Sequence, residues 1–313
     1  MHSIPRHSPS RRWKTSGLLS RWLLLGGILA LGFLDRTLAI ENGTNGSFNT
    51  TAPTGSDIPN WNTGWTQPQG QSGITGWNYV GIVAGGGGGA SGVYLGNNWV
   101  LTAGHVGPGD FTLGINTYSV VPGSAQSITD SNGTADMTLF QIATAPNLPV
   151  LSIAASAPKA LSTSQAGSKV AMIGYGTSGG LAESWGLNTV TEKNVLVSVG
   201  SFVSTDFVTG YGTTTMGSHS ATNNYFLFLG DSGGGDFIFN STSAQWELAG
   251  INEAVDGSNN SAMVQLSTYA PQINAIVTTP EPTSCVFLGG GLLALLGNAR
   301  LGRVRHAGRG DRK

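Results

Sequence analysis

Gly230-Asp231-Ser232-Gly233-Gly234 is the stretch that decides the fold of this chain, and two upstream stretches complete its meaning. Val100-Leu101-Thr102-Ala103-Gly104-His105 ends an apolar run on a histidine, and Asp136-Met137-Thr138-Leu139-Phe140 opens another run with an aspartate. A serine hydroxyl is a poor nucleophile near neutral pH, so it needs a base beside it and an anion to orient that base. The order His, Asp, Ser supplies all three groups from distant parts of the chain.

Competing candidates for the base and the anion are few. Of the five histidines, only His105 and His219 lie in the region expected to fold. His105 follows an apolar run, as expected of a residue that a strand end delivers into a cleft. Asp136 leads directly into an apolar run, whereas Asp110 and Asp130 sit in turns rich in Gly, Ser and Asn.

These motifs, in this order, resemble the chymotrypsin/trypsin-like serine peptidase family. The resemblance implies His105, Asp136 and Ser232 as the catalytic residues, and an acyl-enzyme route to hydrolysis of polypeptide substrates. It implies an oxyanion hole formed by the amides of Gly230 and Ser232, and no cofactor or metal. The runner-up hypothesis is a catalytically silent member of the same fold that acts as a binding protein of the envelope or matrix.

The secondary-structure pattern independently indicates an all-β protein. Short β-branched runs alternate with Gly, Asn and Ser turns, which is typical of sandwiches and barrels. The resemblance covers about residues 77–276 and implies two six-stranded antiparallel β-barrels, at 77–160 and 161–279. A low-complexity arm is expected at 40–76, and a short C-terminal helix at Thr268–Ile276 with Pro271 in its first turn.

The substrate pocket departs from the family pattern. Gly235 replaces the proline that usually follows the serine motif. Ungapped alignment puts Phe226 on the pocket floor, which predicts small or apolar substrate side chains. It also puts Asn252 and Glu253 on the strand that lines the cleft, with Glu253 where the family usually has a serine. A carboxylate near Asp136 is repulsive and raises a pKa, so either the alignment slips by one residue or the cleft is built differently.

The charge distribution argues against nucleic acid as a partner. Every arginine lies at or before Arg36, or at or after Arg300. From residue 40 to 279 the chain has three lysines and thirteen acidic residues, a formal charge of −10. Phosphate binding needs a basic face, which this region does not offer. The single cysteine, Cys285, precludes an intrachain disulfide.

The N-terminus has the pattern of a secretory signal peptide. Basic residues precede an apolar stretch, and Thr37-Leu38-Ala39 forms a small-x-small cleavage site. We therefore expect residues 1–39 to be removed by signal peptidase, which exposes Ile40. Family members commonly pair a new N-terminal Ile or Val with the aspartate before the nucleophile, here Asp231. The alternative is that 40–76 is a loose arm and that local hydrogen bonds satisfy Asp231.

The C-terminus, residues 280–313, has three parts. Pro280-Glu281-Pro282 precedes an apolar stretch, Cys285 to Leu296, and then a basic tail. This order resembles the PEP-CTERM sorting signal of Gram-negative bacteria. It implies transient membrane association, processing by an exosortase-type enzyme, and transfer to the cell envelope or extracellular matrix. The alternative is a simple C-terminal membrane anchor.

Overall fold

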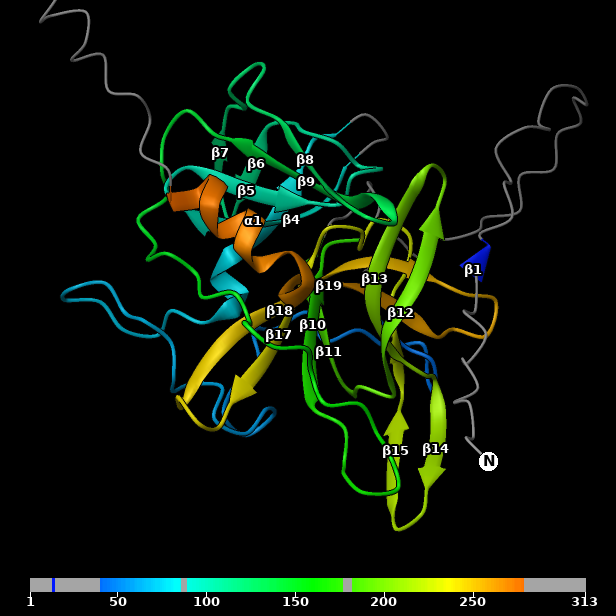
Figure 1. Ribbon diagram of the computed structural model, residues 1–313. Helices are drawn as coiled ribbons and strands as arrows, with labels where there is room; N and C mark the ends of the chain where they lie inside the picture. Colours follow the sequence, from blue (N-terminus) through cyan, green and yellow to red (C-terminus); the bar gives the residue numbers. More distant parts are fainter. Residues whose placement is uncertain (1–12, 15–39, 86–88, 177–181, 279–313) are drawn as a thin grey trace, which may run out of the picture. The chain divides into compact units, whose positions relative to one another are not determined.

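Two antiparallel sheets dominate the computed structural model, which describes residues 13–14, 40–85, 89–176 and 182–278 (Figure 1). The first sheet has the strand order β7-β6-β3-β4-β5-β9-β8. Its strands are β3 (Val80–Val83), β4 (Ala90–Gly96), β5 (Trp99–Thr102), β6 (Phe111–Leu113), β7 (Asn116–Tyr118), β8 (Gln126–Asp130) and β9 (Gly133–Gln141).

The second sheet has the order β1-β12-β13-β19-β18-β17-β10-β11. Its strands are β1 (Trp13–Lys14), β10 (Lys169–Gly174), β11 (Ser184–Thr189), β12 (Glu192–Val199), β13 (Phe202–Thr209), β17 (Gly235–Asn240), β18 (Gln245–Val255) and β19 (Ser261–Gln265). Two small ribbons accompany it: β14 (Gly212–Met216) with β15 (His219–Asn223), and β2 (Glu41–Asn42) with β16 (Tyr225–Phe226).

One interrupted strand closes each sheet into a barrel. In the first, β7 and β8 come from one continuous segment, and a bridge between Val120 and Ile142 joins its middle to the end of β9. In the second, β11 and β12 are separated by two residues; β11 pairs with β10, and β12 pairs with β13. The two-residue β1, which pairs only with β12, lies outside this closed ring. Counting each interrupted strand once then gives six strands per barrel. The predicted fold class, all-β with two six-stranded barrels, is confirmed.

The C-terminal helix packs back onto the first barrel. It spans α1 (Leu266–Thr278), and Leu266, Tyr269 and Ile273 are fully buried in the main apolar core. Asn97 Nδ2 donates to the carbonyl of Val277 at 3.1 Å, which fixes the end of the helix. The helix begins two residues before the predicted start, so the expectation that Pro271 lies in the first turn is wrong. Pro271 lies in the second turn, where it has no N–H to donate to a preceding carbonyl.

The segment 40–76 lies against the second barrel and is anchored by aromatic side chains. The Trp61 ring meets Trp246 edge-on at 4.9 Å between centroids, and Trp65 stacks on the same ring at 5.6 Å. The side chain of Ile40, at the other end of the segment, is fully buried. This part of the chain is therefore a packed component of the second barrel.

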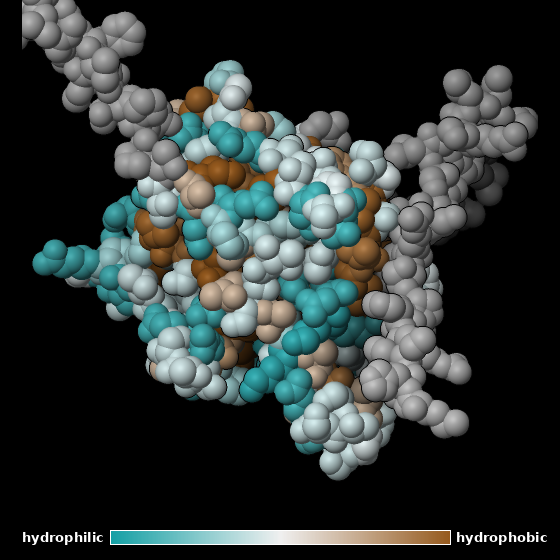
Figure 2. All heavy atoms as spheres, in the orientation of Figure 1, coloured by the Kyte–Doolittle hydropathy of each residue, from teal (hydrophilic) through white to brown (hydrophobic). Residues whose placement is uncertain are grey.

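The surface and the helix content add two observations. On the face drawn in Figure 2, hydrophilic and neutral side chains prevail, and apolar side chains form scattered patches. Within the part of the chain that the structure describes, no helix combines the length and the apolar character that crossing a membrane requires. Residues 1–12, 15–39 and 279–313, which carry nearly all of the expected signal peptide and sorting tail, lie outside the described residues.

Candidate active site

His105 is delivered by the end of β5. All four residues of β5 are buried, so the strand is fixed in the first barrel until the chain leaves it at Ala103 and Gly104. A Cβ on Gly104 would lie 3.0 Å from Asp136 Oδ1, so the absence of a side chain lets the histidine loop approach that carboxylate closely. The loop thereby turns the His105 ring toward the second barrel.

Asp136 lies inside β9, three residues after the strand begins, and is fully buried. Its Oδ1 accepts the backbone N–H of His105 at 2.8 Å, and its Oδ2 accepts the ring Nδ1–H at 2.7 Å. The competing aspartates lie elsewhere: Asp110 accepts the Val120 amide, and Asp130 caps a turn at Asn132. The structure therefore brings Asp136, of the three candidates, to His105.

Ser232 lies in the tight turn between β16 and β17. Its Oγ is 2.8 Å from His105 Nε2, so the hydroxyl can donate its proton to the ring nitrogen that faces it. Gly233 has φ +82°, and a Cβ there would collide with the Ser91 carbonyl and the Thr102 hydroxyl. The glycines of the motif thus let the serine turn press against the first barrel, where Ser91 N also donates to Ser232 O at 2.9 Å.

The amides of Gly230 and Ser232 donate no hydrogen bond among the described residues. Gly230 has φ +91°, a backbone conformation that side chains other than glycine rarely adopt. Its carbonyl accepts the Ser91 hydroxyl at 3.2 Å, which anchors the peptide on that side. Two unengaged N–H groups beside a nucleophile are the arrangement that stabilises a developing oxyanion.

Asp231 is fully buried and accepts three backbone amides. The donors are Phe228 N at 2.7 Å, Ile40 N at 3.0 Å and Gly176 N at 3.3 Å. Burial raises the pKa of Asp231 to about 7, while these three hydrogen bonds lower it. The structure therefore brings Ile40 to Asp231, across 191 positions of sequence.

The surroundings of His105 raise the pKa of its ring. Desolvation lowers the pKa of His105, but the hydrogen bond that its ring donates to Asp136 and the charges of Asp136 and Glu253 raise it, and the net direction is upward. A base with a raised pKa accepts a proton more readily from a neighbouring hydroxyl.

A cleft of about 180 Å³ opens beside His105 and Ser232. Its other lining residues are mostly apolar: Val199, Leu227, Phe228, Leu229, Glu253, Ala254 and Val255. Phe226 is not among them, because its ring packs edge-on against Tyr211 at 5.7 Å. Asn252 is fully buried and donates to the carbonyls of Ile173 and Asp231. The structure does not place Phe226 or Asn252 on this cleft, and Leu227 and Phe228, which follow Phe226 in the chain, line it instead.

Glu253 lies at the cleft, but its carboxyl group turns inward. It is 3% exposed, and its Oε1 accepts the hydroxyl of Ser204 at 3.1 Å. Asp206, also on β13, faces it. Ser204 and Asp206 have no signal in the sequence, since no motif marks a serine and an aspartate two positions apart in a polar strand.

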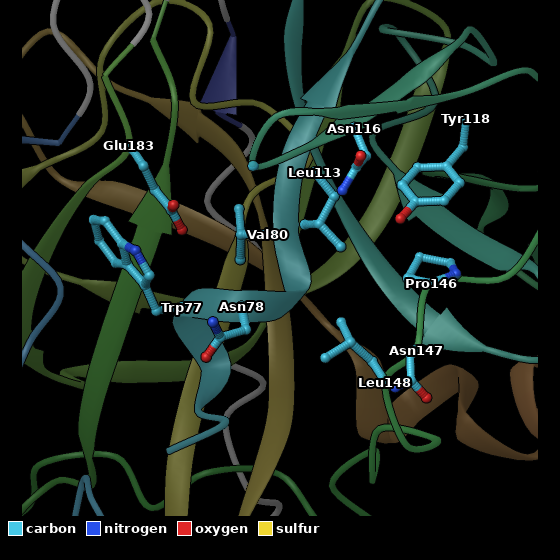
Figure 3. A pocket seen from close by; sticks show the side chains of 11 residues that line it. Trp77, Asn78, Val80, Leu113, Asn116, Tyr118, Pro146, Asn147, Leu148 and Glu183 are labelled. Carbon is cyan, nitrogen blue, oxygen red and sulfur yellow. The ribbon is translucent and has the colours of Figure 1, made fainter. Parts of the chain in front are cut away.

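A second cavity, of about 300 Å³, lies away from the three candidate catalytic residues (Figure 3). Trp77 and Glu183 stand on one side of it, and Tyr118 and Asn147 on the other. Glu183 Oε2 accepts the hydroxyl of Tyr175 at 3.0 Å, and burial raises the pKa of Glu183 well above its ordinary value. Among the described residues, no group of three or more His, Cys, Asp or Glu side chains could hold a metal ion in either cavity.

Two antiparallel barrels with a serine, a histidine and an aspartate at their junction define the chymotrypsin-like class of fold. The family model described as Trypsin matches residues 68–277, about two thirds of the chain. The chain therefore belongs to the trypsin family.

The solved structures that resemble the chain do so distantly. The Rv3671c protease in its inactive form is 17% identical, with 64% of this chain and 89% of that chain covered and a TM-score of 0.45. The active form of that protease from M. tuberculosis is 15% identical, with coverages of 66% and 83% and a TM-score of 0.45. Human heparin binding protein is 16% identical, with coverages of 70% and 96% and a TM-score of 0.45. No curated protein matches the chain.

Proposed function

We propose that this protein is an exported serine endopeptidase that hydrolyses peptide bonds through His105, Asp136 and Ser232. The carrying observation is the chain of contacts Ser232 Oγ to His105 Nε2 at 2.8 Å and His105 Nδ1 to Asp136 Oδ2 at 2.7 Å. Family membership supports a serine peptidase-type hydrolase with polypeptide substrates.

The proposed mechanism has two steps. Ser232 Oγ attacks the scissile carbonyl while His105 Nε2 takes the hydroxyl proton, and the buried Asp136 stabilises the imidazolium that forms. The amides of Gly230 and Ser232 receive the oxyanion, and His105 returns the proton to the leaving amine, which leaves an acyl-enzyme on Ser232. Water then attacks the ester with His105 as the base, which releases the acid product and restores the serine.

Labelling with a serine-directed fluorophosphonate probe tests the proposal. The wild-type protein should be labelled on Ser232, and Ser232→Ala should not be labelled. A folded wild-type protein that resists labelling and leaves a mixed peptide library intact would favour a catalytically silent binding protein instead.

Maturation is proposed to occur at Ile40. Removal of residues 1–39 by signal peptidase would convert the Ile40 amide into an α-ammonium group 3.0 Å from Asp231 Oδ2. The fully buried Ile40 side chain and the pairing of β2 with β16 support a fixed N-terminus at this position. The ion pair would strengthen a contact beside the oxyanion amides, so export alone would activate the enzyme.

Two variants distinguish this proposal from the alternative in which residues 40–76 form a loose arm. One alanine added before Ile40 in the mature protein should displace the amine and lower kcat, and Asp231→Asn should act in the same direction. Unchanged activity in both variants would remove the amine–carboxylate pair from the mechanism.

The tail is proposed to be a PEP-CTERM sorting signal that an exosortase-type enzyme processes near Pro280. Its support is the sequence order of Pro280-Glu281-Pro282, an apolar stretch and a basic end. Deletion of residues 280–313 should release active protein into the periplasm or medium. Retention of the truncated protein in the membrane fraction, or loss of its activity, would contradict the assignment.

A further inference from the structure

Strands β13 and β18 bring two carboxyl groups together behind the candidate triad. Asp206 is fully buried and Glu253 is 3% exposed. Neither oxygen of Asp206, nor Oε2 of Glu253, has a donor among the described residues when both groups are treated as carboxylates. Burying a carboxylate without a donor or a cation is costly, so this arrangement needs a further partner.

A proton held between the two carboxyl groups meets this need. Ser204 and Asp206 are two residues apart on β13, so their side chains leave the same face of the strand, and Ser204 contacts Glu253 at 3.1 Å. The two carboxyl groups are therefore neighbours. Desolvation raises the pKa of Asp206 to about 7 and that of Glu253 well above its ordinary value, and the two groups act on each other. One proton between them turns two repelling acceptors into a donor and an acceptor, and the pair then carries one negative charge.

The pair is connected to the triad through one hydroxyl group. Ser204 Oγ donates to Glu253 Oε1 at 3.1 Å and accepts the backbone N–H of Asp136 at 2.8 Å. The Asp136 carboxylate in turn holds both the backbone and the ring of His105. Glu253 therefore fixes the hydroxyl that fixes the main chain of Asp136.

The titratable surroundings of the pair are mostly acidic. The charge of Asp136 on β9 raises the pKa of both carboxyl groups, and the charge of Asp236 on β17 raises that of Asp206. The charge of Asp206 in turn raises the pKa of Tyr269 on α1. The charge of Glu253 also raises the pKa of His105. β19 has no titratable residue, and Glu192 and Lys193 of β12 are exposed. Among the described residues, His105 is thus the one group at this site that can become cationic.

We propose that Asp206 and Glu253 share one proton and act as positioning residues for His105 and Asp136. The proposal rests on the peptidase function proposed above and assigns Glu253 a role in it. The neutral partner keeps Ser204 in place, and the shared proton prevents Asp206 and Glu253 from being negatively charged at the same time.

A direct role of Glu253 in substrate binding fits the geometry less well. Its accessible fraction is 3%, and one of its oxygens is engaged by Ser204 on the side away from the cleft. A carboxylate that recognises a basic substrate side chain must instead present its oxygens to the cavity.

Three variants test the proposal with purified protein. Glu253→Gln reproduces the protonated carboxyl: its amide oxygen can accept from Ser204, and its amide N–H can donate to Asp206. Glu253→Ala removes both contacts. Asp206→Asn combined with Glu253→Gln keeps the volume of the pair and removes its charge.

We expect kcat of Glu253→Gln to stay within about three-fold of the wild type, and kcat of Glu253→Ala to fall about 10–100-fold with little change in KM. Because Glu253→Ala could lose its fold, Ser204→Ala breaks the same link without touching the carboxyl pair and should lower kcat in the same way. Wild-type kcat in folded Ser204→Ala and Glu253→Ala would overturn the positioning role. A Glu253→Gln variant as impaired as Glu253→Ala would overturn the shared proton.

A second readout does not depend on peptidase activity. The imidazole of His105 is titrated by NMR in the Ser232→Ala background. Its pKa should remain in place in Glu253→Gln, where the pair keeps one charge, and should move to lower pH in the double variant, where the charge is gone. A downward shift of the His105 pKa already in Glu253→Gln would overturn the shared proton, because that variant would then have removed a charge. If wild-type protein neither labels nor hydrolyses peptides, the proposed function fails while this titration still decides the protonation of the pair.

Discussion

The two barrels share a topology but differ in how many carboxyl groups they bury. Among the described residues, the first barrel buries one carboxyl group, Asp136, within a core of aliphatic and aromatic side chains. The second barrel buries Asp206, Asp231, Asp236 and Glu253 together with several amide and hydroxyl side chains. Because buried polar groups cost free energy unless they are hydrogen-bonded, the two interiors cannot contribute equally to stability.

This difference separates two tasks. The first barrel presents His105 and Asp136 from strands held by apolar packing. The second presents Ser232 from a turn held by hydrogen bonds to a buried carboxylate, Asp231. The first barrel therefore serves as an apolar scaffold. The second barrel contains a network of buried carboxyl groups whose protonation can vary.

The largest expected effect comes from two residues that the two different barrels contribute. Ser232→Ala and His105→Ala should each lower kcat about a million-fold, and the double variant should lose no more than either single one, because the two residues act as a unit. The measurement is kcat on a peptide substrate identified from a library, with circular dichroism to check the fold.

Ser220→Ala is the matched control for the first prediction, since Ser220 is exposed on the β14–β15 ribbon. It should behave as the wild type. Losses that multiply in the double variant would mean that the two barrels contribute independently, which would contradict a shared site.

The second prediction concerns the apolar scaffold. Leu101 is fully buried in β5 beside the site, and Leu101→Ala should lower the free energy of unfolding by about 3–5 kcal/mol through lost burial and a cavity. Urea denaturation in the Ser232→Ala background measures this without self-digestion. Ile115→Ala, at a 98% exposed side chain, should change it by less than about 0.5 kcal/mol. Similar losses in both variants would show that the first barrel does not depend on its core.

The sequence was sufficient for the fold class because its apolar runs and its three motifs are local. β10 and β17 each coincide with one of these apolar runs. The motifs also indicated His105, Asp136 and Ser232, which the structure brings together.

The remaining features depend on long-range packing. The sequence of β13 has no continuous apolar pattern because Ser204, Thr205 and Asp206 interrupt it. Ser204 and Asp206 are buried only once β9 and β18 pack against this strand. Phe226 was assigned to the pocket floor by alignment, but its pairing with β2 turns the ring to Tyr211. Neither contact has a signature in local sequence.

The third prediction concerns the cleft, to which the first barrel contributes His105 and the second barrel contributes the apolar side chains. Leu227, Phe228 and Val255 offer no counter-charge to a buried cation, so a Leu or Ala substrate side chain should be preferred over Arg or Lys by about 100-fold in kcat/KM. Profiling on a peptide library measures the ratio. A profile led by Arg or Lys would mean that Glu253 turns toward the substrate, which would also contradict the inward geometry of its carboxyl group.

The smallest expected effect tests whether the polar interior carries a cost. Asp236 on β17 is fully buried, and neither of its oxygens has a donor among the described residues. Burial, together with the charge of Asp231, raises the pKa of Asp236 well above its ordinary value of 3.8. A group whose pKa is raised on folding contributes stability that is fully present below its unfolded value and is lost as pH rises through the folded-state value. The free energy of unfolding should therefore fall between pH 5 and pH 8.

Asp236→Asn removes this ionisation with little change in volume, so it should raise the free energy of unfolding at pH 8 by about 1–2 kcal/mol and have a smaller effect at pH 5. Urea denaturation at both pH values, again in the Ser232→Ala background, measures the difference. Glu192→Gln is the control, because Glu192 is exposed on β12 and should leave the pH dependence unchanged. If Asp236→Asn destabilises the protein equally at both pH values, Asp236 is satisfied in the folded state. The second barrel would then be as well compensated as the first, and the contrast between their interiors would be one of composition alone.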